Sequence, residues 1–134
     1  MGQALSRSES REVAFRLIFA LGNHGTQIDD EAWTLALDGK TAPALEQQYI
    51  EQVVNTFVDL REKIDARIGA HLQKWTLDRL RQTDLAVLRL AIAEMMLGSV
   101  PAPVIINEAV NLAKKYGEVQ SGAFVNGLLA KLAE

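Results

Sequence analysis

The segment INEAVNLAKKYG, residues 106–117, carries amide and amine side chains that could bind phosphate. On a helix with 3.6 residues per turn, Asn107, Asn111, Lys114 and Lys115 fall within about 100° of one another. Apolar residues occupy the opposite side, so the expected helix is amphipathic. Such a face can contact phosphate groups or a partner chain, but it can equally be the solvated back of a helix. The pattern alone leaves both interpretations open.

Aromatic side chains lie beside basic ones in two other segments. Phe124 falls at the edge of the apolar stripe of the last expected helix. Near the N-terminus, Phe15 and Phe19 lie off the main stripe, flanked by Arg11 and Arg16. Aromatic residues interleaved with arginines suit single-stranded nucleic acid, on whose bases they can stack. They also suit packing against a second copy of the chain.

The charge is uneven along the 134 residues. The formal net charge is −3, and the sequence pI is about 5.4. Thr26–Leu60 contains seven acids and one base, Lys40, so this segment carries −6 and the rest carries +3. An acidic total can therefore accompany a basic surface elsewhere.

Several classes of site are disfavoured by composition. There is no cysteine, which excludes disulfides and thiolate metal sites and fits a reducing cytosol. His24 and His71 share no ligand spacing, and no apolar run is long enough to cross a bilayer. We therefore expect no metal, no cofactor, no membrane partner and a cytoplasmic location.

The elements that must position these residues are all helical in pattern. Apolar residues recur at threes and fours, and no segment alternates as a strand would. We expect helices at about 8–21, 30–37, 44–72, 84–97, 104–116 and 121–132, with a short helical turn within 76–81. Ser6 with Glu9 predicts a capping box, and Asp29 or Asp30 and Thr83 predict further caps.

The expected helix at 84–97 is apolar nearly all round, which is typical of a helix in the middle of a bundle. Its polar members Asp84, Arg89 and Glu94 fall on three different sides. We interpret Arg89 and Glu94 as buried ionic groups that orient their neighbours, in preference to catalytic or partner-binding residues.

Three motifs in this half resemble the NusB family of bacterial transcription antitermination factors. They are WTLDRLRQTDLAVLRLAIAEMML, VIINEAVNLAKKYG and FVNGLLAKLA, which together cover residues 75–133 densely. SRSESREVAFRLIFAL resembles the first helix of the family more loosely, and residues 22–72 match only in length and helical pattern. The resemblance implies an all-α fold of two small helical bundles packed together, with subdomains at about 1–74 and 75–134.

The resemblance also implies a function without enzyme activity. Family members bind the boxA element of ribosomal RNA leader transcripts together with NusE, a small-subunit ribosomal protein. That complex joins the antitermination machinery on RNA polymerase. The family's RNA-side positions match Arg7, Arg11, Phe19, Lys114 and Phe124 here, with Lys115 as a further phosphate contact, and Asp84 matches the side that meets NusE.

One departure from the family concerns the N-terminal arginine run. Here it reads RSESR, with three residues between Arg7 and Arg11, so we expect a smaller electrostatic contribution to RNA binding. Asn107 and Glu108 lie nearest the proline-containing break and are expected to fix that loop or cap the helix.

Two alternatives stay open at this point. One is a homodimeric helical module that binds RNA weakly and uses Phe15 and Phe19 as its interface. The other is an RNA-binding domain related to ribosomal RNA cytosine methyltransferases. The absence of a glycine-rich cofactor loop disfavours the methyltransferase alternative.

Overall fold

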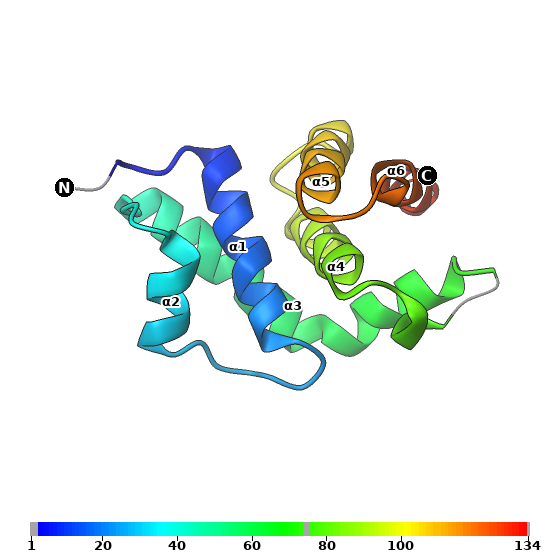
Figure 1. The fold of residues 1–134 in the computed structure, drawn as a ribbon, viewed down its shortest axis with the longest axis horizontal. Coiled ribbons are helices and arrows are strands. Elements are labelled where there is room, and N and C mark those ends of the chain that lie inside the picture. The colour runs from blue at the N-terminus through cyan, green and yellow to red at the C-terminus, as the bar shows by residue number, and fades with distance from the viewer. Residues whose placement is uncertain (1–2, 74–75, 134) are drawn as a thin grey trace.

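Helices account for nearly all the regular structure in the computed structural model, which describes residues 3–73 and 76–133. The elements are α1 (Arg7–Leu21), α2 (Asp30–Leu37), α3 (Ala44–Ala70), the 3-10 turn η1 (Leu77–Arg79), α4 (Gln82–Leu97), α5 (Ala102–Tyr116) and α6 (Ser121–Leu132) (Figure 1). No strand forms in these two ranges, although Ala4 and Thr41 make an isolated bridge. The predicted all-α fold is confirmed; Trp75 of the first motif lies outside the described residues.

Two of the predicted N-terminal caps form as expected. The Ser6 hydroxyl accepts a hydrogen bond from the Glu9 backbone N–H at 3.2 Å, and the Glu9 carboxylate accepts one from the Ser6 N–H at 2.9 Å. At the start of α2, the Asp29 carboxylate accepts the Ala32 N–H at 2.8 Å. These bonds satisfy N–H groups that have no partner within the helix, and they fix where α1 and α2 begin.

The prediction that Thr83 caps α4 is wrong. The helix begins at Gln82, and its flanking residue Arg81 is extended, with φ −61° and ψ 139°. The first helical hydrogen bond runs from the Leu85 N–H to the Arg81 carbonyl at 2.9 Å. Thr83 already lies inside the first turn, so its hydroxyl cannot reach back to cap the helix.

Helix α4 is the centre of the fold, as its all-round apolar pattern predicted. Every residue from 84 to 94 is buried, and Figure 1 shows α4 beside α1, α3, α5 and α6, all of which it contacts. One continuous hydrophobic core therefore joins the first three helices to the last three. The division into subdomains at about residue 74 stays a prediction.

The long helix α3 bends where the sequence predicted none. Leu60 has non-helical backbone angles, φ −113° and ψ 18°, in the middle of the element. No proline or glycine lies near it, so the usual local signals of a kink are missing. Phe57 and Ile64 on either side are both fully buried, so the bend keeps the two halves of α3 on the same core.

Candidate nucleic-acid interface

Arg7 occupies the first turn of α1, where the capping box holds the backbone. Its Nε and Nη2 donate to the two carboxylate oxygens of Glu46 at 2.8 and 3.1 Å. Its guanidinium also lies 4.3 Å from the centre of the Tyr49 ring. The hydrogen bond with Glu46 raises the pKa of Arg7 above its ordinary value. The side chain remains 43% exposed, so it is a surface cation that already has a partner.

Arg11, one turn later, does not share that surface. Only 5% of Arg11 is exposed, and its Nε and Nη2 donate to the carboxylate of Glu94 at 3.0 and 2.9 Å. A carboxylate of Glu108 lies 3.4 Å from Nη1. Glu94 is 1% exposed, lies toward the C-terminal end of α4 and needs a countercharge, because an unpaired buried charge is strongly unfavourable. Arg11 therefore joins α1 to α4 inside the core. Its charge neutralises that of Glu94.

The expectation for Arg89 and Glu94 is confirmed by their surroundings. Arg89 is 3% exposed and donates from Nε and Nη2 to the Asp65 carboxylate of α3, each at 2.9 Å. Its Nη2 also donates to the Asn23 side chain at 3.0 Å, after the end of α1. Both residues of α4 are thus buried ionic groups that hold neighbouring helices in place.

The carboxylate of Glu12 draws α5 against α1. Its Oε2 accepts from Lys115 Nζ at 2.6 Å and from Arg16 Nη2 at 3.2 Å, and also from the Tyr116 hydroxyl. Burial alone would raise the pKa of Glu12, but the hydrogen bonds from Lys115 and Tyr116 outweigh it and lower that pKa. Lys115 is exposed, yet its ammonium group is already paired.

Glu108 also belongs to this junction and not to the loop. Its Oε1 accepts the Ser8 hydroxyl at 2.7 Å, in addition to its contact with Arg11. Because α5 begins at Ala102, residues 107 and 108 lie in its second turn and cannot cap it. The expectation that Glu108 fixes the proline-containing break is therefore wrong.

An aromatic row runs along the same junction. The ring centres of Phe15 and Tyr116 are 4.7 Å apart, and those of Phe15 and Phe19 are 6.4 Å apart. Phe15 is buried, whereas Phe19 is 47% exposed at the outer end of the row. Only Phe19 can offer a face to a base or a partner, so the alternative of a joint Phe15/Phe19 interface loses one of its two residues.

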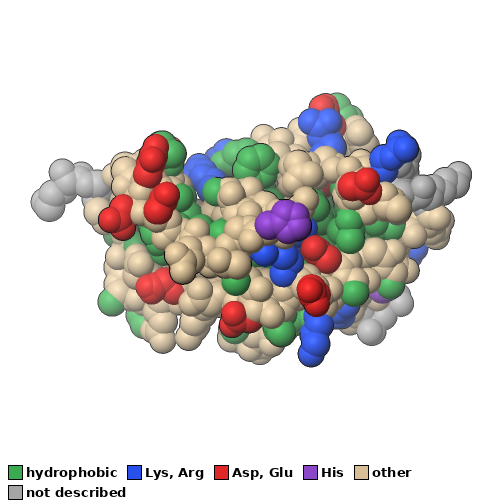
Figure 2. All heavy atoms as spheres, turned by 90° about the horizontal axis from the view of Figure 1, so that it is seen from below, with side chains coloured by type: hydrophobic (Ala, Val, Ile, Leu, Met, Phe, Trp, Pro, Cys, Tyr) green, Lys and Arg blue, Asp and Glu red, His purple; other side chains and the backbone are tan. Residues whose placement is uncertain are grey.

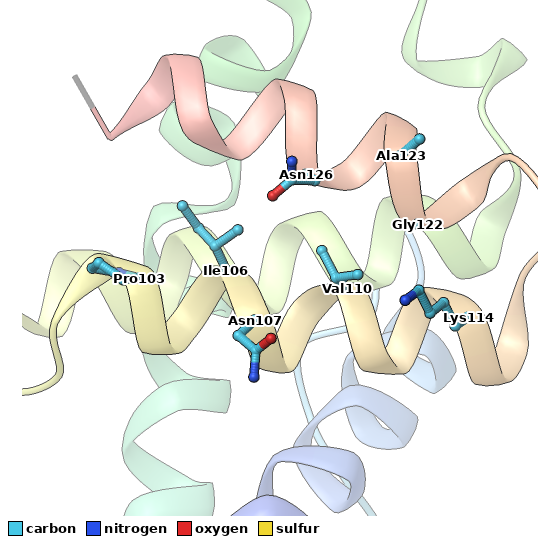
Figure 3. Close-up of a pocket in the computed structure, with 8 residues that line it drawn as sticks. All are labelled: Pro103, Ile106, Asn107, Val110, Lys114, Gly122, Ala123 and Asn126. Atoms are coloured by element: carbon cyan, nitrogen blue, oxygen red, sulfur yellow. The ribbon is translucent and has the colours of Figure 1, made fainter.

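Lys114 lies on the open side of α5, beside a groove between α5 and α6. The groove has a volume of about 620 Å³ and is lined by Pro103, Ile106, Asn107, Val110, Lys114, Gly122, Ala123 and Asn126. Figure 3 shows Ile106 and Val110 pointing from α5 toward α6, and Asn107 pointing away from α6. Within the described part of the chain, Lys114 forms no ion pair, unlike Lys115.

Phe124 lies across α6 from that groove. It is half-buried and lines a second hollow with His71, Leu72, Gln73, Ala123, Gly127, Leu128 and Lys131. Ala123 borders both hollows, so the exposed side of α6 connects Lys114 to Phe124. Figure 1 shows α5 between α1 and α6. The predicted residues thus lie on three neighbouring helices: Arg7 and Phe19 on α1, Lys114 and Lys115 on α5, and Phe124 on α6.

Asp84 is set apart from this surface, in the first turn of α4. It is 6% exposed, and its Oδ1 is buried without a hydrogen-bond partner among the described protein atoms. It does not cap the helix, because Arg81 occupies that position. A carboxylate in the first turn is favoured by the helix dipole, and the free oxygen leaves it able to accept one more hydrogen bond.

The face seen from below Figure 1 carries charges of both signs. Figure 2 shows acidic side chains interspersed with single basic ones over that view. Among the residues that the structure describes, no three His, Asp or Glu side chains gather as a metal site. In the same ranges no helix has the length and apolarity needed to cross a membrane. The fold is thus a small helical bundle with exposed or half-buried cationic and aromatic side chains on three neighbouring helices, α1, α5 and α6.

Comparisons with known proteins identify the family. The family model described as the NusB family matches residues 8–134. The transcription antitermination protein NusB of Agathobacter rectalis is 40% identical over 131 residues, which span 96% of this chain and 100% of that protein. NusB of Bacillus licheniformis is 39% identical over 129 residues, with 96% of each chain covered. The chain belongs to the NusB family.

Solved structures agree with this assignment. T. maritima NusB is similar with a TM-score of 0.85 and 30% identity, covering 99% of this chain and 92% of that one. A crystal structure of the antitermination factors NusB and NusE in complex with double-stranded RNA is similar with a TM-score of 0.82 and 29% identity, covering 95% of both chains.

The sequence could not have indicated the acidic partners of the predicted cations. Glu46 lies 39 residues from Arg7, and Glu12 lies 103 residues from Lys115. The nearest sequence signal was the buried position predicted for Glu94, which requires a basic partner but does not say which one.

Proposed function

We propose that this protein is a transcription antitermination factor that binds boxA-type RNA of ribosomal leader transcripts together with the ribosomal protein NusE. In this role it joins the antitermination complex on RNA polymerase, in the cytoplasm, and catalyses no reaction. The observation that carries the proposal is the similarity over 95% of the chain to a NusB that is bound to NusE and RNA.

The RNA surface in this proposal extends over α1, α5 and α6. Arg7, Lys114 and Lys115 contact phosphates, while the exposed Phe19 and the half-buried Phe124 offer ring faces for stacking. Arg11 supports the surface from inside by its ion pair with Glu94. This assignment retains every RNA-side residue expected from the sequence except Arg11, which is buried.

Asp84 is assigned to the NusE side. The support is its unpartnered Oδ1, which can accept a hydrogen bond from a donor of the partner. Asp84→Asn tests this role, with NusE affinity and stability measured on the same protein. A loss of stability without a loss of NusE affinity would remove Asp84 from the partner side.

The test of the function is a titration with boxA-type RNA, with and without NusE. We expect modest affinity for the protein alone and a clear gain when NusE is present. Sedimentation of the protein with and without RNA distinguishes this from the homodimer alternative. A stable dimer that binds neither RNA nor NusE would contradict the proposed function.

A further inference from the structure

We infer that Glu46 and Glu12 set the RNA affinity of this protein by occupying the cations on which RNA depends. The inference rests on the proposed function and goes beyond it, because it assigns an affinity-limiting role to two acids outside the expected contact set. An RNA phosphate that reaches Arg7 or Lys115 must displace a carboxylate that is already in place.

The Glu46 carboxylate is fixed by hydrogen bonds from two residues, Arg7 and Ser10. Two parallel hydrogen bonds at 2.8 and 3.1 Å join the guanidinium to the carboxylate, which is the geometry that a phosphate would otherwise take. The fully buried Ser10 hydroxyl donates to the same Glu46 oxygen at 2.7 Å. The buried Ser10 therefore holds the Glu46 carboxylate in place beside Arg7, while Arg7 remains partly exposed to solvent.

Lys115 is occupied in a similar way. Its ammonium group lies 2.6 Å from Glu12 Oε2, and Glu12 is fixed by Arg16 and Tyr116 as well. Lys114, its neighbour in sequence, forms no such pair within the ranges described. Two adjacent lysines thus differ in availability: Lys114 can meet a phosphate directly, and Lys115 must exchange one partner for another.

Charge exchange of this kind lowers affinity without removing the contact. An exposed ion pair is worth up to about 1 kcal/mol, which corresponds to about fivefold in binding. Each phosphate neutralised on a single strand adds ~0.7 to the salt slope of log K. A cation that is already paired contributes less than this, so the basic surface binds more weakly than a count of its side chains suggests.

The experiment compares Glu46→Gln with the parent in binding a short single-stranded RNA that carries boxA, over a range of salt. We expect binding about two- to fivefold tighter at low salt, and a salt slope steeper by up to ~0.7. Glu51→Gln is the matched control, because it removes one charge from the exposed side of the same helix. Glu46→Asp keeps the charge but shortens the side chain, so it should also weaken the pair and tighten RNA binding.

The decisive comparison repeats Glu46→Gln in an Arg7→Ala background. If Glu46 acts by occupying Arg7, then in the Arg7→Ala background Glu46→Gln should change RNA affinity no more than Glu51→Gln does. Thermal melting of each variant checks that the fold is intact, and Glu46→Asp carries the test if Glu46→Gln does not fold.

The possible results separate the inference from the function. Equal RNA affinity of Glu46→Gln and Glu51→Gln, or a gain that persists without Arg7, overturns the inference and leaves the proposed function standing. Failure of every variant and of the parent to bind RNA, even with NusE, overturns both.

Discussion

Two arginines one turn apart on α1 have opposite environments. Arg7 is partly exposed and paired at the surface, whereas Arg11 is buried and paired with Glu94. Their different burial follows from what each faces: the start of α3 for Arg7 and the C-terminal part of α4 for Arg11. At this scale, the same residue type forms a surface ion pair at one position and a buried ion pair at the other.

The first prediction concerns the buried pair. Arg11→Ala leaves the Glu94 carboxylate buried without its partner, so we expect the free energy of unfolding to fall by about 3–5 kcal/mol. Arg7→Ala removes an exposed pair and should reduce it by less than about 1 kcal/mol. Urea denaturation of both variants measures the difference. Similar small losses would show that Glu94 is not held by Arg11.

The second prediction separates the two lysines of α5. Lys114→Ala removes an unpaired cation and should flatten the salt slope of RNA binding by ~0.7. Lys115→Ala removes a cation that Glu12 already holds, so its effect on the slope should be smaller. Filter-binding titrations at four or five salt concentrations measure both slopes. Equal effects of the two substitutions on the slope would show that Glu12 does not compete with phosphate for Lys115.

At the scale of elements, α5 is attached to α1 through polar side chains. Ser8, Glu12 and Arg11 of α1 each reach a residue of α5. Helix α6 is attached differently: it packs on α5 with small residues that allow close approach. Gly122 illustrates this, because a Cβ placed there would lie 3.2 Å from Lys114 Cγ.

The third prediction uses the titration of Glu12 at the α1–α5 junction. Its folded-state pKa is lowered from the ordinary value of 4.5, so its stabilising effect is present above that pH. The effect is lost as the pH falls through the lowered pKa, where Glu12 takes up a proton in the folded state. Glu12→Gln should therefore melt at a lower temperature than the parent at pH 7, with a difference that shrinks toward pH 3.

The exposed Glu62→Gln serves as the control for general charge effects in that experiment. A melting difference for Glu12→Gln that stays constant from pH 7 to pH 3 would contradict the assigned role of the carboxylate.

The fourth prediction compares two glycines of α6. A Cβ at Gly127 would meet nothing within 4 Å. Gly127→Ala should therefore stabilise the protein by roughly 0.5–1 kcal/mol through the higher helix propensity of alanine. Gly122→Ala should show no such gain, because the new methyl group presses against the Lys114 stem. Calorimetric melting of both variants decides; equal gains would mean that α5 and α6 can move apart freely.

At the scale of the whole molecule, local sequence signals predicted most of the fold. The capping box joins residues three apart, and the apolar stripes repeat within one or two helical turns, so both can be read directly. The central position of α4 followed from its lack of a polar face. The Thr83 cap failed because α4 begins earlier than the threonine signal predicted, at Gln82, which leaves Thr83 inside the first turn.

The candidate surface was less predictable, because the burial and pairing of its cations depend on acidic residues far away in the sequence. Phe19, Lys114 and Phe124, for which the resemblance implies RNA contacts, lie on exposed or half-buried helix sides, and their role stays a prediction. The resemblance could not show that Arg11 is buried, since the partner Glu94 lies 83 residues away. The kink at Leu60 has no proline or glycine beside it, so no local sequence signal marks it.

The long reach of the contacts made by α1 has a consequence for how the protein is made. Helix α1 is synthesised first, but Glu94 follows Arg11 by 83 residues and Lys115 follows Glu12 by 103. At the usual ~5–20 residues per second, the ribosome takes roughly 4–17 s to supply Glu94 after Arg11. During that interval α1 has no buried countercharge and no α5 to dock against. The surface on which Arg7 and Lys115 lie is therefore incomplete until α5 has been made, so a nascent chain cannot engage RNA through all of it before that point.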